Sequence, residues 1–92
     1  MPPPQQADLM AVSGNYAIVK LSGRQFPGVM MQGDTFHSLI GDLKEAREGT
    51  MGEAAENLEY VIEALEEVRA FYEETVRANG FRLPYFRDDR NA

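Results

Sequence analysis

The feature that most constrains the fold is the stretch from Gly28 to Ala46, GVMMQGDTFHSLIGDLKEA. Its first residues alternate in direction along an extended chain and predict a short strand. Gly33 and Asp34 predict a tight corner, in which Gly33 takes a backbone conformation closed to other residues and Asp34 caps a helix. Apolar residues then recur at helical spacing, at Phe36, Leu39, Ile40, Leu43 and Ala46. We expect a strand that leads directly into an amphipathic helix, with Gly28, Gly33 and Asp34 as structural corner residues.

The rest of the N-terminal half predicts an antiparallel meander. Residues 9–12 are apolar and are followed by the turn residues Ser13, Gly14 and Asn15. Residues 16–21, YAIVKL, form the clearest strand, with one wholly apolar face. Pro27 cannot donate to a sheet, so we place it at the entrance of the third strand.

Two helices are expected after the sheet. The first spans about residues 35–47, and Gly49 ends it in a left-handed conformation. The second opens with a capping box of Thr50 and Glu53 and runs to Ala78, where Asn79 and Gly80 stop it. Residues 81–86, FRLPYF, predict a final edge strand. The expected fold class is α+β, a three- to four-stranded antiparallel sheet (β-β-β-α-α-β) covered by one short and one long helix.

A single domain is expected over residues 9–86, with a disordered tail at 1–8 and a frayed tail at 87–92. The 92-residue chain is 43% apolar and 26% charged, which is typical of globular proteins. Cysteine is absent, so the sequence offers neither disulfides nor thiolate metal ligands, which fits a cytoplasmic location. We expect no membrane interaction, because no apolar stretch approaches the roughly 20 residues that span a bilayer.

The long helix carries an apolar seven-residue repeat that is too extensive for a small sheet to cover. Such a repeat is typical of a helix that packs along another helix. We therefore predict a homodimer whose seam is formed by Leu58, Val61, Ile62, Leu65, Val68 and Tyr72.

The opposite face of this helix is rich in glutamate. With a net charge of −6, the chain is expected to avoid nucleic acid and to favour a basic protein partner. The partner-binding candidates on the helix are Glu59, Glu63, Glu66 and Glu67, although a solvated surface explains such a run equally well. Arg24 and Phe26 are further candidates, because an arginine and an aromatic on a projecting loop are typical anchors. Phe26 folded back onto the sheet is the alternative.

No catalytic set, metal site or cofactor site is expected. His37 is the only histidine, and it is interpreted as a partly exposed surface residue whose affinity for protons the nearby helix N-terminus lowers. Asp34 is interpreted as a helix cap and not as a catalytic acid, because it stands at the start of the helix. The sequence contains neither an H-E-x-x-H motif nor a glycine-rich phosphate loop. We therefore expect that the protein is not an enzyme.

The segment PGVMMQGDT, from Pro27 to Thr35, and the helix bearing Leu39, Leu43 and Ala46 resemble the N-terminal domain of HicB-type antitoxins. The core from Arg24 to Asp34 is also similar to short uncharacterised bacterial proteins with an R-x-F-P-G-V-x-x-Q-G-D pattern. The resemblance covers about half the chain. It implies three antiparallel strands, a helix and a final strand, and inhibition of a basic ribonuclease toxin by burial of its active surface. HicB proteins commonly carry a C-terminal DNA-binding module, and this sequence shows no counterpart.

These observations predict a non-catalytic binding protein of the antitoxin or immunity type, which neutralises a basic toxin or nuclease by steric and electrostatic occlusion. The alternatives are a self-associating structural or regulatory module and a phage-type acidic inhibitor that mimics nucleic acid.

Overall fold

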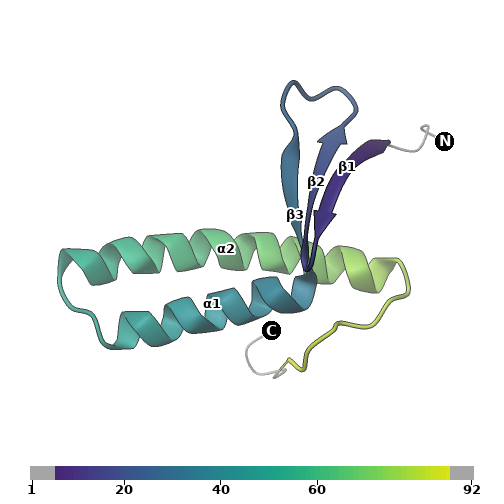
Figure 1. The fold of residues 1–92 in the computed structure, drawn as a ribbon. Helices are drawn as coiled ribbons and strands as arrows, with labels where there is room; N and C mark the ends of the chain where they lie inside the picture. Colours follow the sequence, from purple (N-terminus) through teal and green to yellow (C-terminus); the bar gives the residue numbers. More distant parts are fainter. Residues whose placement is uncertain (1–5, 88–92) are drawn as a thin grey trace. The chain divides into compact units, whose positions relative to one another are not determined.

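A computed structural model describes residues 6–87 of the chain. Three strands are followed by two helices, β1 (Ala7–Ser13), β2 (Tyr16–Leu21), β3 (Gly28–Met31), α1 (Gly33–Glu48) and α2 (Glu53–Ala78) (Figure 1). This arrangement confirms the predicted α+β class. The chain divides after Gln32 into two compact units, one holding the sheet and the other the helices. The expectations of a single domain and of a sheet covered by helices stay predictions.

The sheet is an antiparallel meander in the order β1-β2-β3. A two-residue turn joins Ser13 to its partner Tyr16, and Gly14 takes a left-handed φ of 59° there. The register of the first pair of strands shifts between Leu9 and Ala11. Ala17 is the only sheet residue among the described ones that is fully buried. Because β1 begins at Ala7, the predicted N-terminal tail was too long, and residues 1–5 lie outside the described part.

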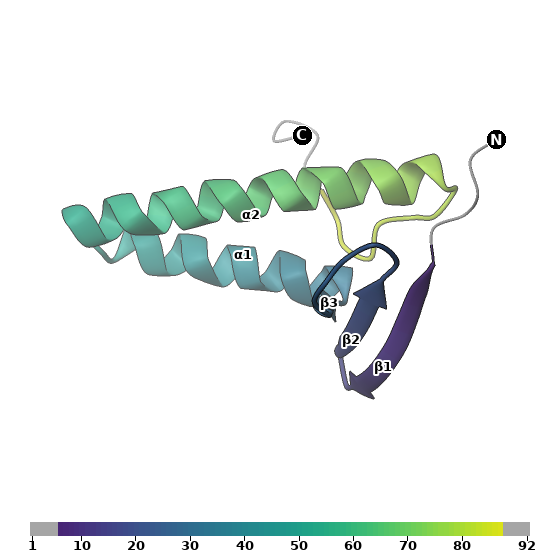
Figure 2. The same ribbon diagram turned by 90° about the horizontal axis from the view of Figure 1, so that it is seen from above.

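The two helices form an antiparallel hairpin, and Figure 2 shows them side by side along the length of α1. Ile40 from α1 and Ile62 from α2 are fully buried and form its core. The helix α2 has 26 residues against 16 in α1, so it is longer by roughly 15 Å at 1.5 Å per residue.

The start of α2 differs from the predicted capping box. The helix begins at Glu53 after Gly52, which has a left-handed φ of 71°, and no side chain caps its first turn. The Thr50 hydroxyl instead donates to the Ala46 carbonyl at 2.8 Å, at the end of α1. The left-handed glycine between the helices is therefore Gly52 rather than Gly49, because the chain reverses one residue before α2.

The predicted stop of α2 at Asn79 and Gly80 is confirmed. The Phe81 amide donates to the Val76 carbonyl and the Gly80 amide to the Arg77 carbonyl, both at 3.0 Å. With Gly80 at a φ of 81°, this pair of bonds is a Schellman motif. The final strand predicted at 81–86 is absent, and these residues form an irregular segment. Pro84 has no N–H to donate to a strand, and Tyr85 hydrogen-bonds to α2 instead.

Candidate functional site

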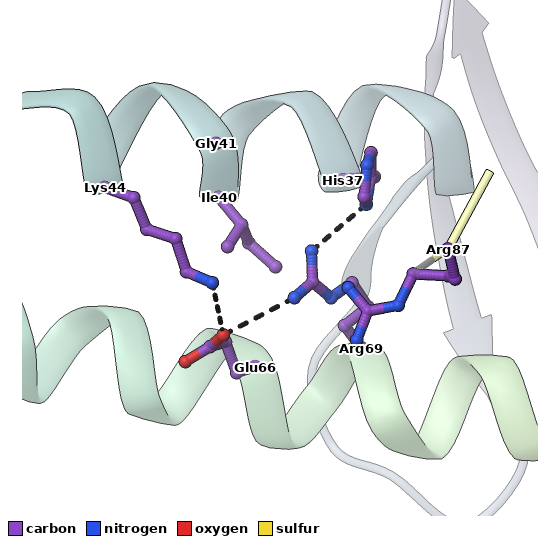
Figure 3. A pocket seen from close by; sticks show the side chains of 7 residues that line it. All are labelled: His37, Ile40, Gly41, Lys44, Glu66, Arg69 and Arg87. Atoms are coloured by element: carbon purple, nitrogen blue, oxygen red, sulfur yellow. Dashed lines mark hydrogen bonds and ion pairs between the residues drawn. The ribbon is translucent and has the colours of Figure 1, made fainter. Parts of the chain in front are cut away.

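A cluster of charged side chains fills one face of the helical hairpin (Figure 3). At its centre Arg69 of α2 is only 6% exposed. Its guanidinium donates to Nδ1 of His37 at 3.0 Å and lies 3.4 Å from Oε2 of Glu66. Lys44 of α1 approaches the same carboxylate oxygen at 2.7 Å. Four side chains, two from each helix, thus form a continuous polar network between α1 and α2.

The segment after α2 joins this network through Glu73. The Tyr85 hydroxyl donates to Oε2 of Glu73 at 2.9 Å, and Nε of Arg87 lies 3.2 Å from the same oxygen. The Tyr85 ring stacks on the ring of His37, with centroids 3.8 Å apart and an interplanar angle of 7°. The segment is therefore tied to both helices, and Arg87, placed in the frayed tail by the sequence prediction, is an anchored residue. Residues 88–92 of that tail lie outside the described part.

The network shifts the pKa values of three of its members. Burial lowers the pKa of His37, and the charges of Arg69 and Arg87 lower it further. The hydrogen bond from Lys44 lowers the pKa of Glu66. Burial and the bond to Glu73 raise the pKa of the Tyr85 hydroxyl. At neutral pH His37 is therefore an uncharged acceptor for Arg69. The expected direction of the His37 shift was right, but its main cause is burial rather than the helix N-terminus.

A cavity of about 410 Å³ opens within this cluster. Its polar lining comes from both helices and from the C-terminal segment, with His37, Lys44, Glu66, Arg69 and Arg87. Ile40 and Gly41 of α1 complete the wall. Over residues 6–87 no group of three or more histidine, cysteine, aspartate or glutamate side chains is arranged to hold a metal ion.

A different face of α2 exposes an apolar stripe, which we define as Tyr60, Val61, Ala64, Val68 and Phe71. Their spacing of three, four and seven residues places them on one side of the helix. The four larger members are 44–77% exposed, so none of them is buried against α1.

An acidic stripe runs beside the apolar stripe. It consists of Glu56, Glu63, Glu67 and Glu74, which are all exposed. Of the predicted partner-binding glutamates, Glu63 and Glu67 belong to this stripe. Glu59 and Glu66 do not, because Arg47 pairs with Glu59 and Lys44 with Glu66 across the hairpin.

The predicted dimer seam is divided between two surfaces. Ile62 is fully buried within the chain, and Tyr72 lies against Gly33 of α1. Leu58 and Leu65 are partly buried. Ile62 is therefore a core residue of the hairpin and not part of a seam between two chains. Val61 and Val68 are exposed, and their role in a dimer stays a prediction.

The predicted corner also has a different cause from the one expected. Gly33 does not have a positive φ and is the first residue of α1. It is buried, and a Cβ there would collide with the Tyr72 ring. Glycine is therefore required by close packing on α2 rather than by backbone conformation. Asp34 accepts a hydrogen bond from the Thr35 amide at 2.8 Å from within the first helical turn. Gly28 begins β3 with a negative φ.

The loop between β2 and β3 exposes both of its predicted anchor residues. Phe26 is 74% exposed, so the alternative in which it folds back onto the sheet is wrong. Arg24 and Phe26 line a cavity of about 460 Å³ together with Leu21 and Val29. Their role in partner binding stays a prediction.

Sequence reasoning missed Arg69, Glu73 and Tyr85 as members of a site. A signal for Arg69 was present, because it continues the seven-residue row of Ala55, Ile62 and Val76. A charged residue in an otherwise apolar row marks a buried position that needs polar partners. Tyr85 and Glu73 carried no local signal, since their contact depends on how the chain turns after Gly80.

An antiparallel three-stranded sheet followed by a helical hairpin makes this an α+β protein that carries a polar cavity and an exposed amphipathic helix. The chain belongs to a family of unknown function, DUF6959, whose profile matches residues 3–85. Comparisons with curated proteins and with solved structures give no match. Within residues 6–87, neither helix is long and apolar enough to cross a membrane.

Proposed function

We propose that the protein is a non-catalytic binding protein of the antitoxin or immunity type, which attaches to a basic protein through α2 and occludes its active surface. The observation that carries this proposal is the adjacency of the apolar and acidic stripes on one helix. Since the chain has no cysteine, we place this function in a reducing cytoplasm.

The apolar stripe supports the proposal through its exposure. Phe71 is 72% and Tyr60 77% exposed, and large aromatic side chains are the residues that most often dominate binding energy. Contiguous exposed apolar surface on a small protein is typical of a binding site.

The acidic stripe specifies the chemistry of the partner. Four exposed glutamates line one edge of the apolar stripe, on a chain of net charge −6. A partner with an apolar patch bordered by lysine or arginine complements both stripes. Charge complementarity of this kind accelerates association more than it raises affinity.

The test is binding to small basic proteins encoded beside the gene, measured by surface plasmon resonance with the full chain. Val68→Asp is expected to abolish the complex, whereas Val29→Asp, at an exposed valine of β3, leaves it intact. The pair Glu63→Lys and Glu67→Lys is expected to slow association about tenfold at low salt. The matched control Glu45→Lys with Glu48→Lys makes the same charge change on α1. Absence of any complex, or equal binding by Val68→Asp and the wild type, overturns the proposal.

Self-association is a second candidate, and the exposure of the apolar stripe favours it. The apolar stripe is exposed because it does not pack against α1, so a second copy of α2 can lie along it. Sedimentation velocity at low micromolar concentration tests this. Because pairing would bring two acidic stripes together, added salt would strengthen a dimer, whereas it would weaken a complex with a basic protein. A monomer at both salt concentrations excludes this candidate.

A further inference from the structure

The cavity on the polar face of the hairpin has an unusual charge for this protein. Over residues 6–87, the basic residues that line it are Lys44, Arg69 and Arg87, although the chain as a whole is acidic. Among the lining residues that the structure describes, only Glu66 carries a negative charge. Figure 3 shows that these side chains come from α1, α2 and the C-terminal segment and converge on one space.

Arg69 shares the carboxylate of Glu66 with Lys44. A buried guanidinium needs charged or strong hydrogen-bonding partners. Its closer partner is a neutral ring nitrogen at 3.0 Å, and its carboxylate partner lies at the longer distance of 3.4 Å. Lys44 holds that same oxygen at 2.7 Å, so one carboxylate serves two cations. An external anion in the cavity would give these two cations a second negatively charged partner.

Gly41 supports a role for the cavity as a binding site, because the absence of a side chain there leaves the cavity unfilled. A glycine inside a helix costs stability relative to alanine, yet a Cβ at this position would meet nothing within 4 Å. Close packing therefore does not explain this glycine. Because Gly41 lines the cavity, any larger side chain there would reduce the space beside Lys44.

We propose that this cavity binds a phosphate group, either free or as the ester of a small molecule. Donors from three separate segments surround the space, which suits a tetrahedral anion with oxygens in several directions better than a planar carboxylate. The volume of about 410 Å³ lies within the range of small-molecule sites. The site uses a face of α2 other than the two stripes and does not depend on the proposed partner.

The single histidine makes the test direct, because His37 lines the cavity and gives the only imidazole NMR signals of the chain. The probes are inorganic phosphate and phenyl phosphate, with malonate for comparison, at constant pH and ionic strength. Either phosphate is expected to shift the His37 signals saturably, with a Kd of about 1 mM or tighter. If phenyl phosphate binds more tightly, the natural ligand is a phosphate ester. If inorganic phosphate binds more tightly, the natural ligand is the free ion.

Two variants separate binding in the cavity from general charge effects. Lys44→Gln is expected to weaken phosphate binding about tenfold, because it removes one charge-assisted donor. Lys20→Gln, at the only other lysine, makes the same charge change in β2 and leaves the affinity unchanged. Gly41→Leu places a good helix former in the cavity and is expected to abolish the shift, while circular dichroism shows an intact fold. A shift that does not saturate, an equal affinity for malonate, or equal effects of the two lysine variants overturns the proposal.

Discussion

Different interactions stabilise the sheet and the helical hairpin of this chain, each within itself. Backbone pairing between neighbouring strands joins β1, β2 and β3, and large apolar side chains such as Leu9, Val12 and Val29 remain exposed. The hairpin contains two fully buried isoleucines and ion pairs that connect both helices and the C-terminal segment. Within residues 6–32 no ion pair is found.

This difference between the two units predicts in which of them a substitution lowers the free energy of unfolding more. A backbone hydrogen bond contributes only about 0.5–1.5 kcal/mol net, because the unfolded chain bonds to water instead. Complete burial of an aliphatic side chain contributes about 1.5–3 kcal/mol. We therefore expect the hairpin to be sensitive to single side chains and the sheet to tolerate their replacement.

The largest effect is expected from Ile62→Ala, which removes a fully buried side chain from the hairpin core. It should lower the free energy of unfolding by about 2–5 kcal/mol. Val29→Ala, at an exposed position of β3, should change it by no more than about 0.5 kcal/mol. Urea unfolding followed by far-UV circular dichroism measures both. Equal losses would show that the two units do not differ in this way.

A smaller loss is expected from Gly33→Ala, because the added Cβ collides with the Tyr72 ring. Overpacking of this kind costs about 1–3 kcal/mol. Tyr72→Leu removes the ring, so the same glycine substitution should cost less in that background. A double-mutant cycle from urea unfolding gives the coupling between the two positions. No coupling would mean that backbone conformation, rather than packing, requires the glycine.

The smallest effect is expected from titration of His37, because the side chain is only half-buried and solvent screens its charge interactions. Its pKa is lowered in the folded protein from an ordinary 6.5, mainly by burial. Below that pH the unfolded chain takes up a proton that the folded chain does not, so stability should fall as the pH drops below about 6.5 towards the folded pKa.

The variant His37→Asn tests this assignment. Asparagine can accept a hydrogen bond through its side-chain oxygen but does not titrate, so the loss of stability between neutral and mildly acidic pH should disappear. Thermal unfolding across this pH range measures the slope for both proteins. A slope that persists in the variant assigns the titration to another group.

Local signals were sufficient to predict most of the secondary structure. The alternation in YAIVKL predicted β2 with its observed bounds, and Asn79 with Gly80 predicted the end of α2. In both cases the physical cause lies within a few neighbouring residues. Features that depend on distant contacts were predicted less well. The sequence predicts a turn conformation for Gly33, because its close neighbour Tyr72 is remote in sequence. It predicts a strand at residues 81–86, because no local pattern reveals the hydrogen bond from Tyr85 to Glu73.

The candidate site was the least predictable part of the molecule. His37 was interpreted as a surface residue, yet it bonds to Arg69 and stacks under Tyr85. These three side chains come from α1, α2 and the segment beyond α2, and no spacing in the sequence brings them together. The glutamates were recognised as a group, but only the packing of α1 separates Glu59 and Glu66, which are paired, from the exposed acidic stripe.

One carboxylate oxygen, Oε2 of Glu73, accepts a hydrogen bond from the Tyr85 hydroxyl and also forms an ion pair with Arg87. Any shortened version of the protein that stops after α2 would leave this buried acid without those two partners and would uncover the imidazole of His37. Recombinant pieces should therefore extend through Arg87.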